Sequence, residues 1–166
     1  PADVRWALRD IAASDNGVVI AQALRDGTAV AVSDGSFKDK FGTAAWVIEG
    51  HHSDGRLEGQ CIIPGGPEDQ SAYRSELGGL YAIAAMVQVI CELHNIQEGS
   101  IEVACDGMNA LAQVGEKDPI IRPNGAQYDI IVATQAKIKR TNIQWKMRHV
   151  MGHQDDTQGC TVMDRW

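Results

Sequence analysis

Three acidic residues stand out by their position relative to the predicted secondary structure. Asp34 follows the apolar segment 29–33, Asp106 follows the apolar segment 101–105, and a glycine comes directly after each acid. Both segments are typical of buried strands, so both carboxylates are predicted at the carboxyl ends of strands, where ligands gather in open α/β sheets. Glu76 lies in the first turns of a long predicted helix between the two strands. From there a third carboxylate would project over the sheet edge toward the other two.

Carboxylates brought together in this way repel one another, and their pKa values rise unless a cation lies among them. A divalent metal ion is the simplest explanation, and a site with only oxygen ligands favours Mg²⁺ or Mn²⁺ over Zn²⁺. The alternative is structural. An Asp-Gly pair after a strand is a common turn signal, and a glutamate near a helix N-terminus is favoured by the helix dipole. The combination of two such pairs with an intervening helix acid favours the metal site.

The elements that must position these acids follow from hydrophobic periodicity. Apolar segments at 29–33, 43–49 and 57–63 have short connections, which predicts three antiparallel strands. Segment 71–93 carries a wide apolar face and predicts a helix about 30 Å long. Segment 101–105 predicts a fourth strand.

The rest of the chain predicts two more helices and one more strand. The helices are expected at 108–114 and 127–140, and the strand at 143–147. Helical crossovers favour parallel strands. We therefore expect an α/β fold with a mixed five-stranded sheet, three antiparallel strands followed by two parallel ones, flanked by helices. In the helix over 127–140, four residues are expected to face inward: Ile130, Ile131, Thr134 and Ile138.

The beginning of the chain is predicted to lie apart from this domain. Segment 4–13 has helical spacing, residues 14–17 break it, and segment 18–24 favours a short helical turn. We expect residues 1–27 to form an N-terminal helical appendage or linker, and residues 28–166 to form the main domain.

Composition sets further bounds on the 166 residues. Hydrophobic residues make up 44% and charged residues 22%, which excludes a mainly disordered chain. No uninterrupted apolar run approaches the ~20 residues of a membrane span, so no membrane partner is expected. The net charge of −7 taken alone argues against a nucleic-acid partner, although an enzyme with a small basic face beside an acidic metal site remains compatible with it.

The cysteines predict the compartment. The chain has four of them, and none form a Cys-x-x-Cys pair, which argues against a zinc knuckle or a redox motif. We expect reduced thiols and an intracellular protein, cytoplasmic or nuclear.

Four short motifs resemble ribonuclease H type 1 in their order and spacing. They are Asp-Gly-Ser at 34–36, Tyr-Arg-Ser-Glu-Leu at 73–77, Cys-Asp-Gly at 105–107 and Val-Met-Gly-His at 150–153. The resemblance covers residues 29–166 and implies a ribonuclease H-like fold. The stretch SDGSFKDKFGTAAWVIEG, together with GHQDD and the closing MDRW, looks most like ribonuclease H domains attached to retroelement reverse transcriptases.

This resemblance implies hydrolysis of the RNA strand of an RNA–DNA hybrid with two Mg²⁺ ions, for which Mn²⁺ can substitute. Asp34 would bridge both ions, while Glu76 and Asp106 would hold one ion and orient water. His153 would assist proton transfer or product release from a mobile loop. The family usually has a fourth metal-binding aspartate after the histidine loop, and Asp164 is the candidate here.

Two features depart from the family pattern. The sequence around Asp164 matches poorly, so Asp155 or Asp156 are further candidates, or the ligand lies past residue 166 on a C-terminal helix that the domain would then lack. The polar pair that commonly reads the minor groove is replaced here by Ala72 and Tyr73.

The substrate-binding candidates also come from the resemblance. Gly35 and Ser36 would admit RNA phosphates and 2′-hydroxyls close to the backbone. Tyr73 would stack on a sugar, or pack on the sheet instead. Arg74 would contact the nucleic-acid backbone, or lie along its own helix instead.

The first hypothesis is therefore a metal-dependent ribonuclease H acting on RNA–DNA hybrids, within a polyprotein that also carries a reverse transcriptase domain. One alternative is a non-catalytic ribonuclease H-like module that binds or scaffolds, which the acidic charge and the missing polar pair favour. Another is a DNA nuclease on the same fold. The presence of all three core acids favours an enzyme.

Overall fold

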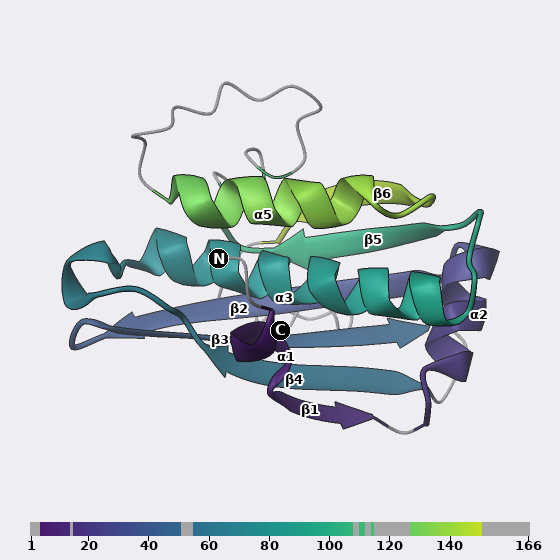
Figure 1. Ribbon diagram of the computed structural model, residues 1–166, viewed down its shortest axis with the longest axis horizontal. Coiled ribbons are helices and arrows are strands. Elements are labelled where there is room, and N and C mark those ends of the chain that lie inside the picture. The colour runs from purple at the N-terminus through teal and green to yellow at the C-terminus, as the bar shows by residue number, and fades with distance from the viewer. Residues whose placement is uncertain are drawn as a thin grey trace.

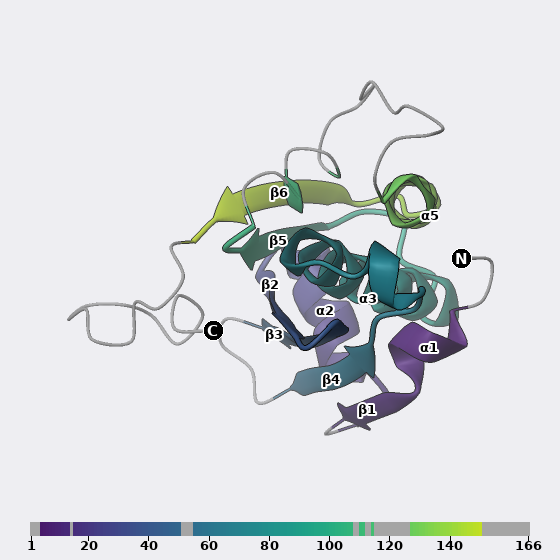
Figure 2. The ribbon, with the colours of Figure 1, turned by 90° about the vertical axis from the view of Figure 1, so that its left-hand side faces the viewer.

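A computed structural model describes residues 4–13, 15–50, 55–107, 110–111, 114 and 127–150, and the statements below concern these residues. Its strands form one sheet that curves around helix α3 (Figures 1 and 2). The elements follow one another along the chain as α1 (Arg5–Leu8), β1 (Asp10–Ala13), α2 (Val18–Asp26), β2 (Ala29–Lys38), β3 (Phe41–Gly50), β4 (Arg56–Ile62), η1 (Pro67–Asp69), α3 (Ala72–Leu93), β5 (Ser100–Cys105), α5 (Tyr128–Lys139) and β6 (Gln144–His149).

The sheet has six strands in the order β1-β4-β3-β2-β5-β6. The pairs β1/β4, β4/β3 and β3/β2 are antiparallel, and the pairs β2/β5 and β5/β6 are parallel. The predicted sheet, with three antiparallel strands followed by two parallel ones, is therefore confirmed. The additional strand is β1 at the edge.

Helix α3 is the central element of the core and has the predicted extent. Ser71 caps its N-terminus by accepting a 3.0 Å hydrogen bond from the backbone N–H of Arg74. Its apolar residues pack on β2 and β3, where Tyr81 and Ile83 are almost fully buried with Trp46 of β3. By length and composition α3 could also cross a membrane, although no uninterrupted apolar run predicted this. About 72% of the relevant window is buried inside the protein, as expected of a core helix.

Helix α5 packs beside α3 and leads into β6 (Figure 1). Ile130, Ile131 and Thr134 are buried as predicted, and Ile138 is partly buried against the same core. Most of the helix predicted at 108–114 lies outside the described residues.

The prediction of one helix over residues 4–13 is wrong beyond Leu8. The chain extends after α1 into β1, which pairs antiparallel with β4 from Asp10 opposite Gln60 to Ala13 opposite Leu57. Without β1, strand β4 would be an edge strand with a row of unpaired backbone groups. This pairing outweighs a weak helical pattern, because helix propensity over a short segment is readily overridden by tertiary context.

The N-terminal elements share the core of the main sheet. The indole of Trp6 in α1 stacks on the ring of Tyr81 in α3, with centroids 5.1 Å apart and planes 13° from parallel. In α2, Ile20 and Leu24 are fully buried in the same hydrophobic cluster as Trp46. A boundary at residue 27 therefore does not coincide with a break in packing, and stability measurements can test whether residues 1–27 are an appendage.

We predict that Leu24→Ala lowers the free energy of unfolding by about 2–5 kcal/mol, because it leaves a cavity in the shared core. Val18→Ser is the matched control, since Val18 lies in the same helix but is 56% exposed. It should change stability by less than about 0.5 kcal/mol. Denaturant unfolding followed by circular dichroism measures both, and a stability of Leu24→Ala equal to wild type would show a true appendage.

Candidate metal centre

Asp34 lies in the middle of strand β2, so the prediction that it follows the strand's end is wrong. Strand β2 continues to Lys38, and Asp34 pairs with Ala45 of β3. What ends here is the pairing with β5, whose last register pair is Val32 opposite Ala104. Strand β5 itself ends at Cys105, directly before Asp106. Two neighbouring parallel strands thus still bring both acids to one place, although only one strand terminates.

A close approach between α3 and β2 brings Glu76 to the same place. A Cβ atom at Gly35 would lie 2.6 Å from the backbone nitrogen of Glu76 and 2.6 Å from the carbonyl carbon of Ser75. A side chain at position 35 would therefore push the helix away. The Ser75 hydroxyl also donates a 3.0 Å hydrogen bond to the carbonyl of Ser36. Gly35 is thus explained by helix packing, whatever substrate the site takes.

The three acids predicted from the sequence converge in the structure. One carboxylate oxygen from each of Asp34, Glu76 and Asp106 lies within 4.8 Å of the other two. Asp34 is exposed, and Glu76 and Asp106 are half-buried. The structure therefore places one solvent-facing and two more sheltered carboxylates in a single cluster.

The cluster is electrostatically unfavourable without a cation. Oε2 of Glu76 and Oδ1 of Asp106 are buried and accept no hydrogen bond within the part of the chain that the structure describes. Burial, followed by the interactions with Asp106 and Asp34, raises the pKa of Glu76 to about 8, against the lowering effect of the Gly35 N–H. Buried polar atoms normally have partners. A divalent cation would satisfy both oxygens and offset the repulsion.

The donor atoms fit Mg²⁺ or Mn²⁺. All three candidate ligands are carboxylates, which hard divalent cations prefer. The neighbouring Cys105 is buried, and this burial raises the pKa of its thiol to about 12. Its Sγ donates a 3.7 Å hydrogen bond to the carbonyl of Gly107. Cys105 therefore stays a neutral thiol, and the three candidate ligands found among the described residues are all carboxylates.

The substrate-binding candidates differ in where they lie. Ser36 is exposed beside Asp34. Tyr73 is half-buried and packs against the hydrophobic core, which agrees with the alternative considered for it.

Arg74 binds residues of α5 and its N-cap. Its guanidinium makes two contacts of 3.0 and 3.1 Å with the carboxylate of Asp129 and one of 2.6 Å with Oε1 of Gln127. Its Nε donates to the carbonyl of Pro64 at 2.9 Å. With 6% of its side chain exposed, Arg74 could reach a nucleic acid only by breaking these contacts. Sequence reasoning missed Asp129, whose only signal was an acid in the first turn of a predicted helix.

Four further candidates lie outside the described residues. They are His153, Asp155, Asp156 and Asp164, and their roles stay predictions.

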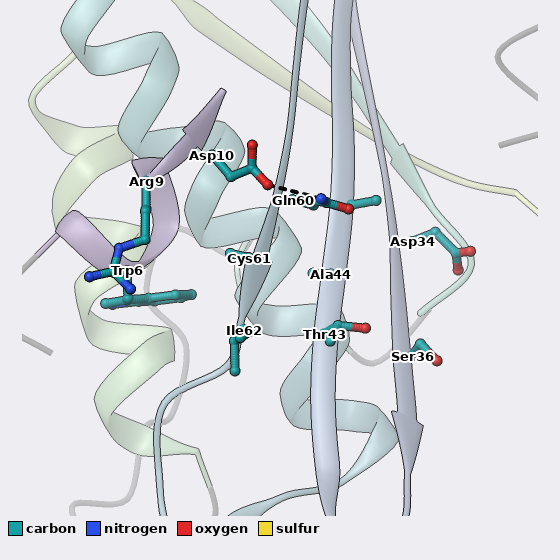
Figure 3. Close-up of a pocket in the computed structure, with 11 residues that line it drawn as sticks. Trp6, Arg9, Asp10, Asp34, Ser36, Thr43, Ala44, Gln60, Cys61 and Ile62 are labelled. Carbon is teal, nitrogen blue, oxygen red and sulfur yellow. Dashed lines mark hydrogen bonds between the residues drawn. The ribbon is translucent and has the colours of Figure 1, made fainter. Parts of the chain in front are cut away.

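A cleft of about 520 Å³ opens beside the cluster (Figure 3). It extends from Asp34 and Ser36 across β3 and β4 to Trp6 and Arg9 at the N-terminal edge of the sheet. Asp34 is therefore reachable from this open space. Sequence reasoning did not connect Trp6 or Arg9 with the site, because only the pairing of β1 with β4 brings them near.

Comparison with known proteins finds likeness in structure alone. No protein-family model matches the chain, and no curated protein sequence matches it. Among solved structures, LC11-RNase H1 in complex with an RNA/DNA hybrid superposes with a TM-score of 0.60 at 11% identity, covering 74% of this chain and 85% of that one. LC11-RNase H1 isolated from compost gives a TM-score of 0.58 at 13% identity, covering 78% and 89%.

A third similar structure is the N-terminal RNase H domain of Rv2228c from Mycobacterium tuberculosis, with a TM-score of 0.50 at 15% identity, covering 74% of this chain and 81% of that one. The identities are low, and the likeness concerns the fold. The chain has a ribonuclease H-like fold, as its motifs predict.

We predict that Glu76→Gln stabilises the protein at pH 8 in the presence of a chelator and has little effect near pH 4.5. The raised pKa means that the folded state favours protonated Glu76. Wild type should therefore lose stability as the pH rises from the ordinary glutamate pKa toward 8, and a neutral glutamine avoids that loss. Thermal melts at both pH values measure the effect, expected as a Tm gain of about 3 °C or more at pH 8.

The control for this experiment is Glu68→Gln, because Glu68 is an exposed acid on η1. Its Tm relative to wild type should be the same at both pH values. A Glu76→Gln difference that is also independent of pH would show that Glu76 is not destabilised by its neighbours.

Proposed function

We propose that this protein is a metal-dependent endonuclease that hydrolyses the RNA strand of RNA–DNA hybrids by a two-metal mechanism. The observation that carries the proposal is the convergence of Asp34, Glu76 and Asp106 within 4.8 Å in a ribonuclease H-like fold, where two buried oxygens of the cluster have no hydrogen-bond partner among the described residues. A purely structural cluster would be expected to pair these oxygens with hydrogen-bond donors instead.

Two Mg²⁺ ions, or Mn²⁺ in their place, would be held by Asp34, Glu76 and Asp106, with Asp34 shared between them. When bound, such ions activate the attacking water and stabilise the leaving 3′-oxygen. The protein holds the ligands in place beforehand. Asp34 is exposed and is one of the residues that line the cleft, whereas Glu76 and Asp106 are half-buried. His153 would assist proton transfer or product release, and Asp164 would supply a fourth ligand.

The proposed substrate class is supported by the similar solved structure that holds an RNA/DNA hybrid. Selection of the RNA strand requires contact with 2′-hydroxyl groups. Gly35 and Ser36 lie next to Asp34 along β2 and are the proposed contacts, with Tyr73 a further candidate. Arg74 is not included, because its guanidinium is engaged with Asp129.

The wider setting is also a proposal. The resemblance of the strand and loop motifs to retroelement ribonuclease H domains supports a parent polyprotein with a reverse transcriptase. Three cysteines in the described part of the chain, Cys61, Cys91 and Cys105, are buried and unbonded to one another. Free buried thiols are typical of a reducing compartment, which supports an intracellular location.

We predict that the protein cleaves a matched RNA–DNA hybrid, but not DNA duplex or RNA duplex, in the presence of Mg²⁺ or Mn²⁺. Asp34→Asn should reduce cleavage to the level of the chelator control. Its Tm should be unchanged or higher, because the substitution relieves carboxylate repulsion. Asp39→Asn is the matched control, since Asp39 is an exposed acid with φ of 53°, a conformation that asparagine also tolerates.

Other outcomes of this assay identify the alternatives. Cleavage of DNA duplex would identify a DNA nuclease, and hybrid binding without cleavage would identify a non-catalytic module. Either result would contradict the proposed function.

We predict that Asp164→Asn separates the two placements of the fourth ligand. If Asp164 binds metal, the variant should lose Mg²⁺-supported cleavage as completely as Asp34→Asn does. If the ligand lies past residue 166, Asp164→Asn should have little effect, Mn²⁺ should support more cleavage than Mg²⁺, and extending the chain should raise activity, because Mg²⁺ demands near-ideal coordination. Cleavage rates with each metal measure the difference.

A further inference from the structure

The cluster of Asp34, Glu76 and Asp106 must be held together by contacts from outside the three acids. Three carboxyl groups have oxygens within 4.8 Å of one another, and they repel one another when ionised to bind a metal. Of the three acids, Glu76 is the one that lies on helix α3. A small shift of the start of α3 away from the sheet would move its carboxyl group away from the other two and relieve the repulsion. Something must therefore oppose that shift before any metal binds.

One side of this turn rests on strand β2. The backbone of Ser75 and Glu76 lies directly against Gly35, and the Ser75 hydroxyl bonds to the carbonyl of Ser36. These contacts prevent the turn from moving closer to the sheet. The Ser75 hydrogen bond and the Gly35 N–H, which bonds to the Glu76 carboxylate, oppose movement away from it.

The other side of the turn is held by Arg74, which comes two residues before Glu76. Its guanidinium bonds to both carboxylate oxygens of Asp129 and to Gln127, and its Nε bonds to the carbonyl of Pro64. These partners come from two separate places, the start of α5 and the segment after β4. Hydrogen bonding to Arg74 lowers the pKa of Asp129, so this carboxylate is ionised at neutral pH.

We propose that Arg74 is a positioning residue that fixes Glu76 in the metal site by tying the first turn of α3 to Asp129 of α5. This inference rests on the proposed metal function of the cluster. It assigns to Arg74 a role different from the substrate contact that the motif resemblance implies. Arg74 acts through the backbone of its own helix turn, and it touches neither the metal nor the substrate.

The planar guanidinium is necessary for this role. Arginine presents its donors in a rigid fork that matches a carboxylate with two parallel bonds, whereas lysine offers one point charge on a flexible chain. Lysine at position 74 would keep the charge opposite Asp129 but could not also reach Gln127 and Pro64 in the same geometry. The Arg74→Lys variant therefore separates geometry from charge.

The test measures Mn²⁺ binding to the whole protein by isothermal titration calorimetry, without nucleic acid. Wild type should bind Mn²⁺, and Arg74→Lys should bind it about 10-fold more weakly or worse, as when outer residues that orient metal ligands are altered. Asp129→Asn should weaken binding in the same direction, and it is the milder change because the side chain of Asp129 is 49% exposed. Ile20→Val, a fully buried change in α2, is the control and should bind like wild type.

Cleavage kinetics then distinguish positioning from substrate contact. A positioning role lowers kcat for the hybrid and leaves KM and its salt dependence unchanged. A phosphate contact would instead raise KM and reduce the salt slope by about one, which would overturn the inference.

The two proposals fail in different ways. If wild type binds no Mn²⁺, the proposed function fails and this inference fails with it. If wild type binds Mn²⁺ while Arg74→Lys or Asp129→Asn binds equally well, the metal site stands and Arg74 is not its positioning residue.

Discussion

The close approach of helix α3 to strand β2 is the constraint on which the site depends. Gly35 has no side chain, so the backbone at Ser75 and Glu76 comes within a distance that a Cβ would block. One turn further along the same helix, Gly79 does the same against Ser33, where an added Cβ would lie 2.9 Å from the serine Cβ. Helix α3 therefore packs closely against strand β2, and this packing brings Glu76 near Asp34.

This packing brings three acidic side chains close together, which is electrostatically unfavourable. Glu76 has a raised pKa, and one oxygen each of Glu76 and Asp106 has no hydrogen-bond partner in the part of the chain that the structure describes, so the site is unfavourable by itself. Unfavourable electrostatic interactions of this kind are common where the surrounding structure holds functional groups in position for a ligand. In this protein the surrounding structure consists of the β2 contacts on one side of α3 and the Arg74–Asp129 pair on the other.

The N-terminal elements extend the same sheet and core. Strand β1 covers the edge of β4, and Ile20 and Leu24 are buried in the main hydrophobic cluster. Trp6 and Arg9 consequently lie at one end of the cleft whose other end holds Asp34 (Figure 3). The first 27 residues thus shape the surroundings of a site whose acids all come from later in the chain.

Sequence alone determined the features that depend on local pattern. The long helix, predicted over 71–93, and the succession of antiparallel and then parallel strands follow from periodicity, which acts over neighbouring residues. The three acids also follow from their positions beside predicted elements. Tertiary structure decided what depends on segments far apart in the chain. The turn-like Ser-Asp-Gly-Ser continues as strand because β3 pairs with it as far as Lys38, and residues 10–13 become strand because β4 offers a free edge. Arg74 turns to Asp129 because α5 packs beside α3. Backbone pairing and the Arg74–Asp129 ion pair join groups that no local pattern connects, so only the folded chain could specify them.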